Sequence, residues 1–499
     1  MAHTSDAASQ HVVVIGGGLA GLSAAYELIQ SGAAVTLLER GGRLGGKLLT
    51  EQIEAGGTWL VEGGADSFVG QKPWAIDLAL ALGLGDELTT AVPRTTTTYI
   101  LRRGRPVPLP AGLSLIVPTN RMALLRSPLL SPLGKLRLLC EPLVAARVGE
   151  SDESVASFVR RRMGREALER LAEPILGGIH SADVERQSLL GTFPRFAAME
   201  REHGSLLRAS RFSRRRSADL NLPNLPQRSP KTAPTAAQRD QLAASPFVTL
   251  RGGMQTLTEA LAAAVRRHAT VRLDTEVVSV ERDRLPDMGY RVRLHDGTTL
   301  TADAVVLTAP THISARLVRS LAPALAEQLG EIRSVSTATV ALGYATADVG
   351  LPLDGYGLVI PRGERRPINA VTMVSHKFAG RVPDGGTLIR VFAGGSRTPA
   401  SYDLDDDSLV AMARAELASI FGIEAVPQLA RVYRWERANP QYDVGHLGRV
   451  AAIRAACPEG LELAGCAYDG VGVPDVIRSG REAGRKLLDT VTGRDTVRG

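Results

Sequence analysis

The residues HVVVIGGGLAGLSAAYELIQSG, at positions 11 to 32, constrain the fold more than any other stretch of this chain. The opening HVVVI is an apolar, β-branched run, which predicts a buried parallel strand. Gly16, Gly18 and Gly21 follow at GxGxxG spacing: the first glycine permits a tight turn, the second lets backbone approach a pyrophosphate, and the third lets helix pack on strand. Apolar residues at helical spacing then lead to Gly32, which is typical of a helix end. The stretch predicts a dinucleotide-binding strand-turn-helix.

The next predicted strand, AAVTLLER, ends in an acidic residue that discriminates between nucleotides. Glu39 lies about 20 residues beyond the glycine loop, where a carboxylate accepts hydrogen bonds from the ribose hydroxyls of adenosine. The same carboxylate disfavours a 2′-phosphate, and with it NADP. FAD and NAD remain as candidates.

A second glycine element separates these two candidates. Arg43, Gly45 and Gly46 belong to the sequence RLGG, a few residues after Glu39. Two close glycines let backbone amides face a second part of a long cofactor, and the arginine can reach a phosphate or hold the acidic strand end. A simple NAD domain has no use for this extension, whereas FAD runs from its adenosine to a ring far across the domain. The pair of glycine elements therefore favours a flavoprotein.

Composition sets the broad class of protein. The chain has 499 residues, of which 44% are hydrophobic and 22% charged, so we expect a soluble globular protein of two or three domains. Its three cysteines form neither a CxxC pair nor a metal pattern, which indicates a reducing compartment and no metal site. No apolar run of 18 residues and no signal-peptide pattern occurs. We expect a cytoplasmic location.

The net charge of +7 points to an anionic partner. Much of the basic excess lies in a Pro-, Ser- and Ala-rich segment, RFSRRRSADLNLPNLPQRSPKTAPTAAQRD. This composition predicts a mobile surface loop, and the alternative is an electrostatic docking patch. Because the segment has no interleaved aromatic residues and no nucleic-acid module, nucleic acid is not an expected partner.

Four further blocks carry a resemblance to a known family. They are ILGGIHSADVERQSLLGTFPRFAAMEREHGSL, LRGGMQTLTEAL, RWERANPQYDVGHLGRV and LELAGCAYDGVGVPDVIRSGREAGRKLL. Together with the N-terminal pattern they resemble the bacterial type of oxygen-dependent protoporphyrinogen and coproporphyrinogen oxidases, within the FAD-dependent amine oxidase superfamily. The resemblance extends over nearly the whole chain. Val476 stands where many members have cysteine, and His180 occupies a position that is often aromatic.

The resemblance implies an α/β plus α+β architecture. A glutathione-reductase-like, Rossmann-type FAD-binding domain would be discontinuous, at residues 1–92, 250–309 and 455–499, with Asp296-Gly297 as a hairpin turn. An antiparallel-sheet substrate domain would span 310–454. Its start would lie earlier, within a mobile basic segment at 206–249. Residues 93–205 would form a helical domain, with one long amphipathic helix beginning near SDES. Its leucines and cations suit a membrane surface; the alternative is a helical roof over the active site.

The resemblance also implies the residues of the site. Val277 would pack on the adenine side of FAD and Trp435 near the flavin ring, while Lys72 would contact a substrate propionate and Gly178 a pyrrole ring. No catalytic side chain is predicted, because the flavin itself accepts the hydride. The full set of expected cofactor contacts is Gly16, Gly18, Leu19, Ala20, Gly21, Glu39, Arg40, Arg43, Gly45, Gly46, Lys47, Gly64, Ala65, Asp66, Ser67, Val277, Trp435, Val471, Gly472 and Val473.

The implied reaction is the six-electron oxidation of a porphyrinogen in haem biosynthesis, with oxygen as acceptor and hydrogen peroxide as by-product. Protoporphyrinogen IX and coproporphyrinogen III both remain open as substrates. The net positive charge and the lysine at position 72 slightly favour coproporphyrinogen III, which has four carboxylates. The implied partners are a peripheral membrane surface and a ferrochelatase-type downstream enzyme. The alternatives are an amine oxidase or carotenoid desaturase, and a non-enzymatic tetrapyrrole carrier.

Overall fold

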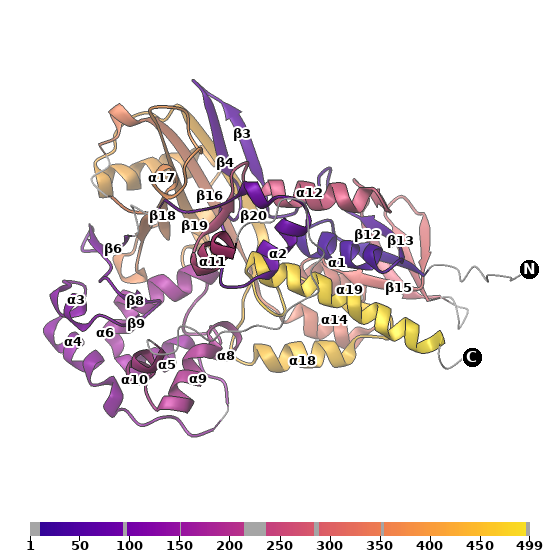
Figure 1. Ribbon diagram of the computed structural model, residues 1–499, viewed down its shortest axis with the longest axis horizontal. Coiled ribbons are helices and arrows are strands. Elements are labelled where there is room, and N and C mark those ends of the chain that lie inside the picture. Colours follow the sequence, from indigo (N-terminus) through magenta and orange to yellow (C-terminus); the bar gives the residue numbers. More distant parts are fainter. Residues whose placement is uncertain are drawn as a thin grey trace, which may run out of the picture.

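A five-stranded parallel sheet lies at the centre of the nucleotide-binding part of the molecule (Figure 1). The computed structural model describes residues 10–92, 97–149, 151–213, 236–283, 289–350 and 354–495. The strand order is β11-β2-β1-β15-β21, and every neighbouring pair is parallel. The strands are β1 His11–Ile15, β2 Ala34–Leu38, β11 Ala269–Arg272, β15 Ala304–Leu307 and β21 Leu461–Leu463. Stretches far apart in the sequence thus build one sheet.

Two separate hydrophobic clusters cover the two faces of this sheet. Val12 and Val14 of β1 point into the cluster formed with helices α1 (Leu19–Gln30), α12 (Gln255–Arg266) and α19 (Val473–Asp495). Val13 and Ile15 point into the other cluster, with helices α13 (Thr311–Leu317), α14 (Pro323–Gly330) and α18 (His446–Ala456). This second face also carries the antiparallel strands β12 (Val277–Arg282), β13 (Tyr290–Leu294) and β14 (Thr299–Ala302). The predicted buried strand is confirmed, because apolar side chains leave β1 on both faces.

Two local predictions are also confirmed. Helix α1 ends at Gln30, and Gly32 follows it with φ +85° while its N–H donates to the carbonyl of Ile29. Gly297, with φ +84°, turns the chain between β13 and β14.

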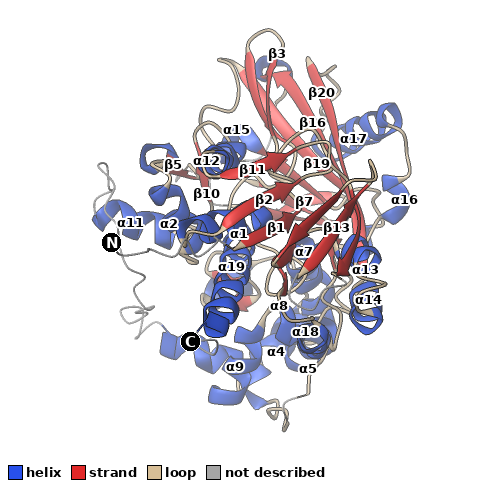
Figure 2. Ribbon diagram, turned by 90° about the vertical axis from the view of Figure 1, so that its right-hand side faces the viewer, coloured by secondary structure: helices blue, strands red, loops and turns tan. Residues whose placement is uncertain are grey.

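A seven-stranded sheet forms the upper left part of Figure 1, in the order β20-β16-β19-β18-β17-β6-β7. Its neighbours are antiparallel except for the parallel pair β17 and β6. Helix α17 (Asp406–Phe421) packs on it, as Figure 2 also shows. The strands are β20 Leu429–Pro440, β16 Ser334–Ala345, β19 Gly386–Gly394, β18 Ala370–Met373, β17 Gly357–Val359, β6 Thr98–Arg102 and β7 Arg105–Pro108.

The remaining described elements are short strands and helices around these two sheets. A hairpin of β3 (Thr50–Glu54) and β4 (Thr58–Glu62) borders the seven-stranded sheet, and β5 (Leu88–Thr90) pairs with β10 (Val248–Leu250). The other such elements are α2 Trp74–Ala81, α11 Ala236–Ala244, α15 Val374–Lys377 and α16 Pro399–Tyr402. Of the predicted mobile basic segment, residues 214–235 lie outside the described residues.

A helical unit occupies the lower left of Figure 1 and differs from the prediction in two ways. First, residues 98–108 form β6 and β7 of the large sheet, because the β-branched run TYIL and the turn at Arg103-Gly104 favour a hairpin. Second, the long helix is broken: α5 (Val155–Met163) ends at Gly164, whose φ is +95°. The segment then continues as a π-helix over Leu168–Gly177, with Pro174 inside it.

The elements of the helical unit are short. They are α3 Arg121–Arg126, α4 Pro132–Leu139, α5, α6 Arg165–Ala167, the π-helix, α7 Gly178–His180, α8 Leu189–Thr192, α9 Pro194–His203, α10 Leu206–Ser213 and the strand pair β8 Leu113–Ser114 with β9 Val117–Pro118. Within the described ranges, no helix combines the length and the apolar character needed to cross a bilayer.

Candidate cofactor and substrate site

The two predicted glycine elements touch each other at the carboxyl end of β1. Gly45 donates its N–H to the carbonyl of Gly17 at 2.9 Å, and Gly18 and Gly45 form a parallel bridge. A Cβ placed on Gly46 would lie 3.0 Å from the Cα of Gly18. A side chain at Gly46 would push the two loops apart. The N-terminus of α1 opens beside this contact and has no side-chain cap, so its free N–H groups can receive an anion.

Each glycine of the first loop has its own structural reason. Gly16 adopts φ +108°, and a Cβ on Gly21 would lie 1.9 Å from the Gly16 carbonyl oxygen. The tight turn and the close helix packing predicted for these two residues are therefore confirmed. Gly18 differs from them: the nearest atom to its would-be Cβ is the Cα of Gly46, at 3.9 Å. Space next to Gly18 is what a bound pyrophosphate requires, so the glycine cradle fits an FAD molecule.

The residues expected at the adenosine end lie together. Glu39 accepts the N–H of Gly17 at 2.7 Å and that of Gly41 at 2.8 Å, which fixes its carboxylate at the rim of the glycine loop. Arg40 lines a hollow with Asp274 and Glu276, immediately before Val277 starts β12. Val277 itself is buried.

Arg43 stabilises the second glycine turn by hydrogen bonds. Its guanidinium donates to the carbonyls of Leu44 at 3.1 Å and Leu48 at 3.2 Å, and also to that of Gly46. These bonds stabilise the turn that carries Gly45 and Gly46, while the charge of Glu39, at the acidic strand end, also acts on Arg43. A contact between Arg43 and a phosphate stays a prediction.

The residues expected near the flavin ring come from three distant parts of the chain. Lys47 donates to the carbonyl of Ala438 at 2.6 Å and contacts Sγ of Cys466 at 3.2 Å. Trp435 donates its indole N–H to the carbonyl of Gly63 at 2.9 Å. A Cβ on Gly64 would lie 1.9 Å from the Lys47 carbonyl oxygen. Strand β20 and the loop after β21 thereby meet the N-terminal segment where the ring is expected.

A buried charge network lies behind the segment Gly64–Ser67. Lys377 contacts the Asp66 carboxylate at 2.9 Å and Arg390 contacts it at 3.5 Å, while Arg390 also donates to the Gly64 carbonyl at 2.6 Å. Burial by itself would raise the pKa of Asp66, but the cations of Lys377 and Arg390 outweigh it and hold that pKa well below its usual range. The network fixes the backbone of a predicted cofactor-contacting segment.

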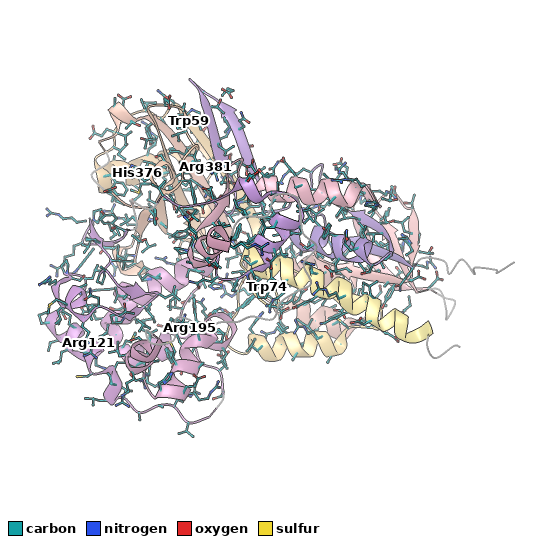
Figure 3. The ribbon with its side chains drawn as sticks, in the orientation of Figure 1. Trp59, Trp74, Arg121, Arg195, His376 and Arg381 are labelled. Carbon is teal, nitrogen blue, oxygen red and sulfur yellow. The ribbon has the colours of Figure 1, made fainter. Side chains whose placement is uncertain are left out.

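A neighbouring pair extends this network. Arg381 is buried and lies 3.6 Å from the Glu62 carboxylate, and it also donates to Thr249 and to the carbonyl of Leu250 (Figure 3). No sequence motif predicted Lys377, Arg381 or Arg390. The available signal was a single arginine inside the apolar strand GTLIRVFAGG, which a strand tolerates only when the charge is paired.

Lys72, the predicted propionate contact, lies beside the C-terminal cofactor segment. Its ammonium donates to both carboxylate oxygens of Asp475, at 2.7 and 2.6 Å, in the first turn of α19. The Lys72 side chain is 45% exposed, so its charge remains open to a ligand. Gly472 and Val473 adjoin Asp475 along the chain. Lys72 and the predicted contacts at 471–473 therefore form one site.

Gly178, the predicted pyrrole contact, borders open space. No atom lies within 4 Å of its would-be Cβ, and the residue is exposed. His180 follows it at the end of α7, and burial, followed by the charge of Lys72, lowers the pKa of His180 to about 4. Because the charge of Lys72 acts on His180, Lys72 lies in the same region of the molecule as Gly178.

The molecule has a parallel sheet, two glycine loops in contact with each other, and a site near the expected flavin ring that is built from three segments of the chain. Together these features define a flavin-dependent oxidoreductase. The chain belongs to the flavin containing amine oxidoreductase family, whose pattern matches residues 19–488. It is 34% identical to the coproporphyrinogen III oxidase of Propionibacterium freudenreichii subsp. freudenreichii, over 97% of this chain and 92% of that protein. It is 32% identical to the coproporphyrinogen III oxidase of Bacillus subtilis (strain 168), over 95% and 97%.

Comparison with solved structures agrees with this family assignment. A protein of Exiguobacterium sp. 255-15, assigned as a protoporphyrinogen oxidase, superposes with a TM-score of 0.81 at 29% identity, over 96% of this chain and 99% of that one. Cyclohexylamine oxidase from Brevibacterium oxydans shares the fold at 18% identity and a TM-score of 0.67, over 97% and 100%. The predictions of an enzyme, of a flavin cofactor and of the porphyrinogen oxidase family are confirmed. FAD is the flavin whose pyrophosphate the glycine cradle fits.

Proposed function

We propose that this enzyme oxidises coproporphyrinogen III to coproporphyrin III in haem biosynthesis. Six electrons leave the substrate in three two-electron steps, and oxygen is the final acceptor, with hydrogen peroxide as the by-product. The observation that carries the proposal is full-length identity of 30% to 34% with relatives named coproporphyrinogen III oxidase. The open space at Gly178 and the accessible ammonium of Lys72 support it, because a bulky macrocycle with carboxylates needs both.

The protein residues have binding and positioning roles in this reaction. Bound FAD supplies the hydride acceptor. The backbone of the two glycine loops holds the pyrophosphate, and the segments at Lys47, Gly64 and Trp435 enclose the ring. Lys72 attracts a propionate while Asp475 fixes its position. Since the product macrocycle is aromatic, the oxidation is strongly favourable, and the protein's main task is to orient the substrate.

The substrate test compares kcat/KM for coproporphyrinogen III and protoporphyrinogen IX in air, followed by porphyrin fluorescence. We expect coproporphyrinogen III to be preferred by more than about tenfold, equivalent to about 1.4 kcal/mol of transition-state discrimination. The physical reason is that coproporphyrinogen III carries two carboxylates more than protoporphyrinogen IX, and the chain has a net charge of +7. A preference for protoporphyrinogen IX would contradict the proposed substrate within the same class. Oxidation of neither, with flavin still bound, would favour an amine or carotenoid substrate instead.

The helical unit supports a proposal about location: the enzyme works in the cytoplasm, peripheral to the membrane. The surface of this unit exposes several large apolar side chains, among them Leu133 (78% exposed), Leu143 (82%) and Val148 (97%). Arg121, which Figure 3 shows at the outer end of the unit, and Lys135 lie among them in sequence. Apolar side chains flanked by cations suit an anionic lipid surface. The same surface is a candidate contact for a ferrochelatase-type downstream enzyme.

Vesicle sedimentation tests this location. We expect the protein to sediment with phosphatidylglycerol vesicles and much less with phosphatidylcholine vesicles, because both buried apolar area and anionic charge contribute. The double variant Leu133→Asp/Leu143→Asp should lose at least about tenfold in partitioning. Val426→Asp is the matched control, since Val426 is 75% exposed but lies outside the helical unit. Equal binding of the wild type to both lipids would argue against the proposal.

A further inference from the structure

His180 lies at the boundary between the helical unit and the seven-stranded sheet. Its ring meets Phe193 edge-on at 5.6 Å and Tyr442 at 6.3 Å. Its carbonyl accepts a bond from Gln441 at 3.2 Å, and the next residue, Ser181, accepts the N–H of Ser396 at 3.0 Å. These contacts fix the end of α7, which also carries Gly178.

Tyr442 connects His180 to the C-terminal cofactor segment. The Tyr442 hydroxyl donates to the Cys466 carbonyl at 2.7 Å and accepts the N–H of Gly470 at 2.8 Å. His180 is therefore separated by a single phenol ring from the loop that leads to the predicted flavin contacts at 471–473. Gly178 and His180 belong to the same short helix, α7, and a Cβ on Gly178 would meet no atom within 4 Å, so a porphyrinogen on this open side of Gly178 would adjoin His180.

The imidazole of His180 keeps both ring nitrogens free. Among the described residues, no protein group hydrogen bonds to either of them. His11 contrasts with this, because its two ring nitrogens contact Thr301 and Thr36 at 2.8 and 2.9 Å. His446 also has a partner, the Tyr468 carbonyl, at 3.3 Å. A histidine that is held in place by aromatic rings but not by hydrogen bonds is available to a ligand.

Burial first, and then the charge of Lys72, lower the pKa of His180 and keep this imidazole neutral. Lys72 is the charged group that acts on it, and Asp475 pairs with Lys72. Tyr442 is the other titratable group in contact, and burial raises the pKa of its phenol, so it stays uncharged. Since the pKa of His180 is lowered to about 4, one ring nitrogen can accept a proton at neutral pH.

We propose that His180 accepts the proton of a substrate pyrrole N–H during each two-electron oxidation, an inference that rests on the proposed function. A C–H bond of a bridging methylene breaks and its electron pair leaves as hydride to the flavin. The pyrrole N–H bond breaks, its proton passes to His180, and its electron pair completes the new C=N bond. Hydride and proton together account for the two electrons and two protons removed per step. The imidazolium then returns its proton to solvent. The finished porphyrin has lost four methylene hydrogens but only two N–H hydrogens, so after the third step one methylene proton moves to a pyrrole nitrogen by tautomerisation.

The kinetic test compares His180→Phe and His180→Gln with the wild type, using coproporphyrinogen III and FAD-loaded enzyme. General acid–base catalysis typically contributes about 10²–10⁴-fold, so we expect kcat to fall by at least about 100-fold in both variants. KM and flavin content should change little, because the phenylalanine keeps the packing on Phe193 and Tyr442. The acid limb of the wild-type kcat profile, near pH 4, should disappear. His268→Gln, at an exposed histidine that follows α12, is the control and should keep wild-type kcat.

A second readout does not depend on turnover. In the holoenzyme labelled with ¹⁵N-histidine, the His180 ring resonances are assigned by their absence in His180→Gln, and coproporphyrin III is then added. We expect these resonances to shift while those of His268 do not. A wild type that oxidises porphyrinogens while His180→Phe keeps more than half of its kcat would overturn the role of His180, as would unmoved His180 resonances. A wild type that oxidises no porphyrinogen would overturn the proposed function instead.

Discussion

Gly18→Ala is expected to yield a folded protein that has lost most of its flavin. The added methyl meets no protein atom closer than the Cα of Gly46, at 3.9 Å, so the polypeptide can accept it. The same methyl occupies space that the pyrophosphate needs. We expect the FAD dissociation constant to rise by at least about tenfold, or 1.4 kcal/mol. The measurement is flavin absorbance per protein after purification, together with FAD titration of the apoprotein.

Two other glycine variants separate binding from folding. Gly330→Ala, at a helix end with open space around it, should keep its full flavin content. Gly21→Ala should lose flavin and also melt earlier, because its methyl would collide with the Gly16 carbonyl. If Gly18→Ala retained flavin as well as Gly330→Ala does, the cofactor would have to pass elsewhere.

Lys377→Met is expected to destabilise the protein by about 3–5 kcal/mol at neutral pH, the usual effect of removing one partner of a buried ion pair. Lys377 and Asp66 are 8% and 13% exposed, so solvent replaces little of the lost interaction. Because the network holds the Gly64 carbonyl and the Ser67 hydroxyl, flavin release should accompany unfolding. Urea unfolding followed by flavin fluorescence and by circular dichroism measures both effects.

The acid dependence of this variant has a definite sign. The pKa of Asp66 is lowered in the folded protein relative to about 3.9 in an unfolded chain. Its stabilising contribution is therefore fully present above pH 4 and is lost as the pH falls through the folded value. Removing Lys377 raises that folded value, so the variant should begin to lose stability at a higher pH than the wild type. Arg165→Met, which breaks the exposed pair with Glu169, should behave as the wild type.

Local sequence patterns were sufficient for the nucleotide-binding core. The strand HVVVI, the glycines of both loops and the helix that follows them are neighbours in the chain, and each has a steric reason that sequence spacing can express. The hairpin at Gly297 was predictable for the same reason.

Long-range partners could not be found in this way. Lys377 and Asp66 are 311 positions apart, and no sequence pattern near either residue predicts the other. The π-helix before Gly178 was missed because its sequence keeps ordinary helical spacing, and only Pro174 indicates that the regular bonding is interrupted.

The packing of α19 on α1 has a consequence for how the protein is made. A Cβ on Gly480 would lie 2.3 Å from the Ala20 carbonyl oxygen, so the two helices touch at their backbones directly behind the glycine loop. The ribosome completes α1 early but reaches residues 473–487 only after roughly half a minute to a minute and a half, at typical elongation rates. Until then one face of α1 lacks its cover, and β21 is missing from the sheet. We therefore expect stable flavin loading only after the C-terminal helix has been synthesised.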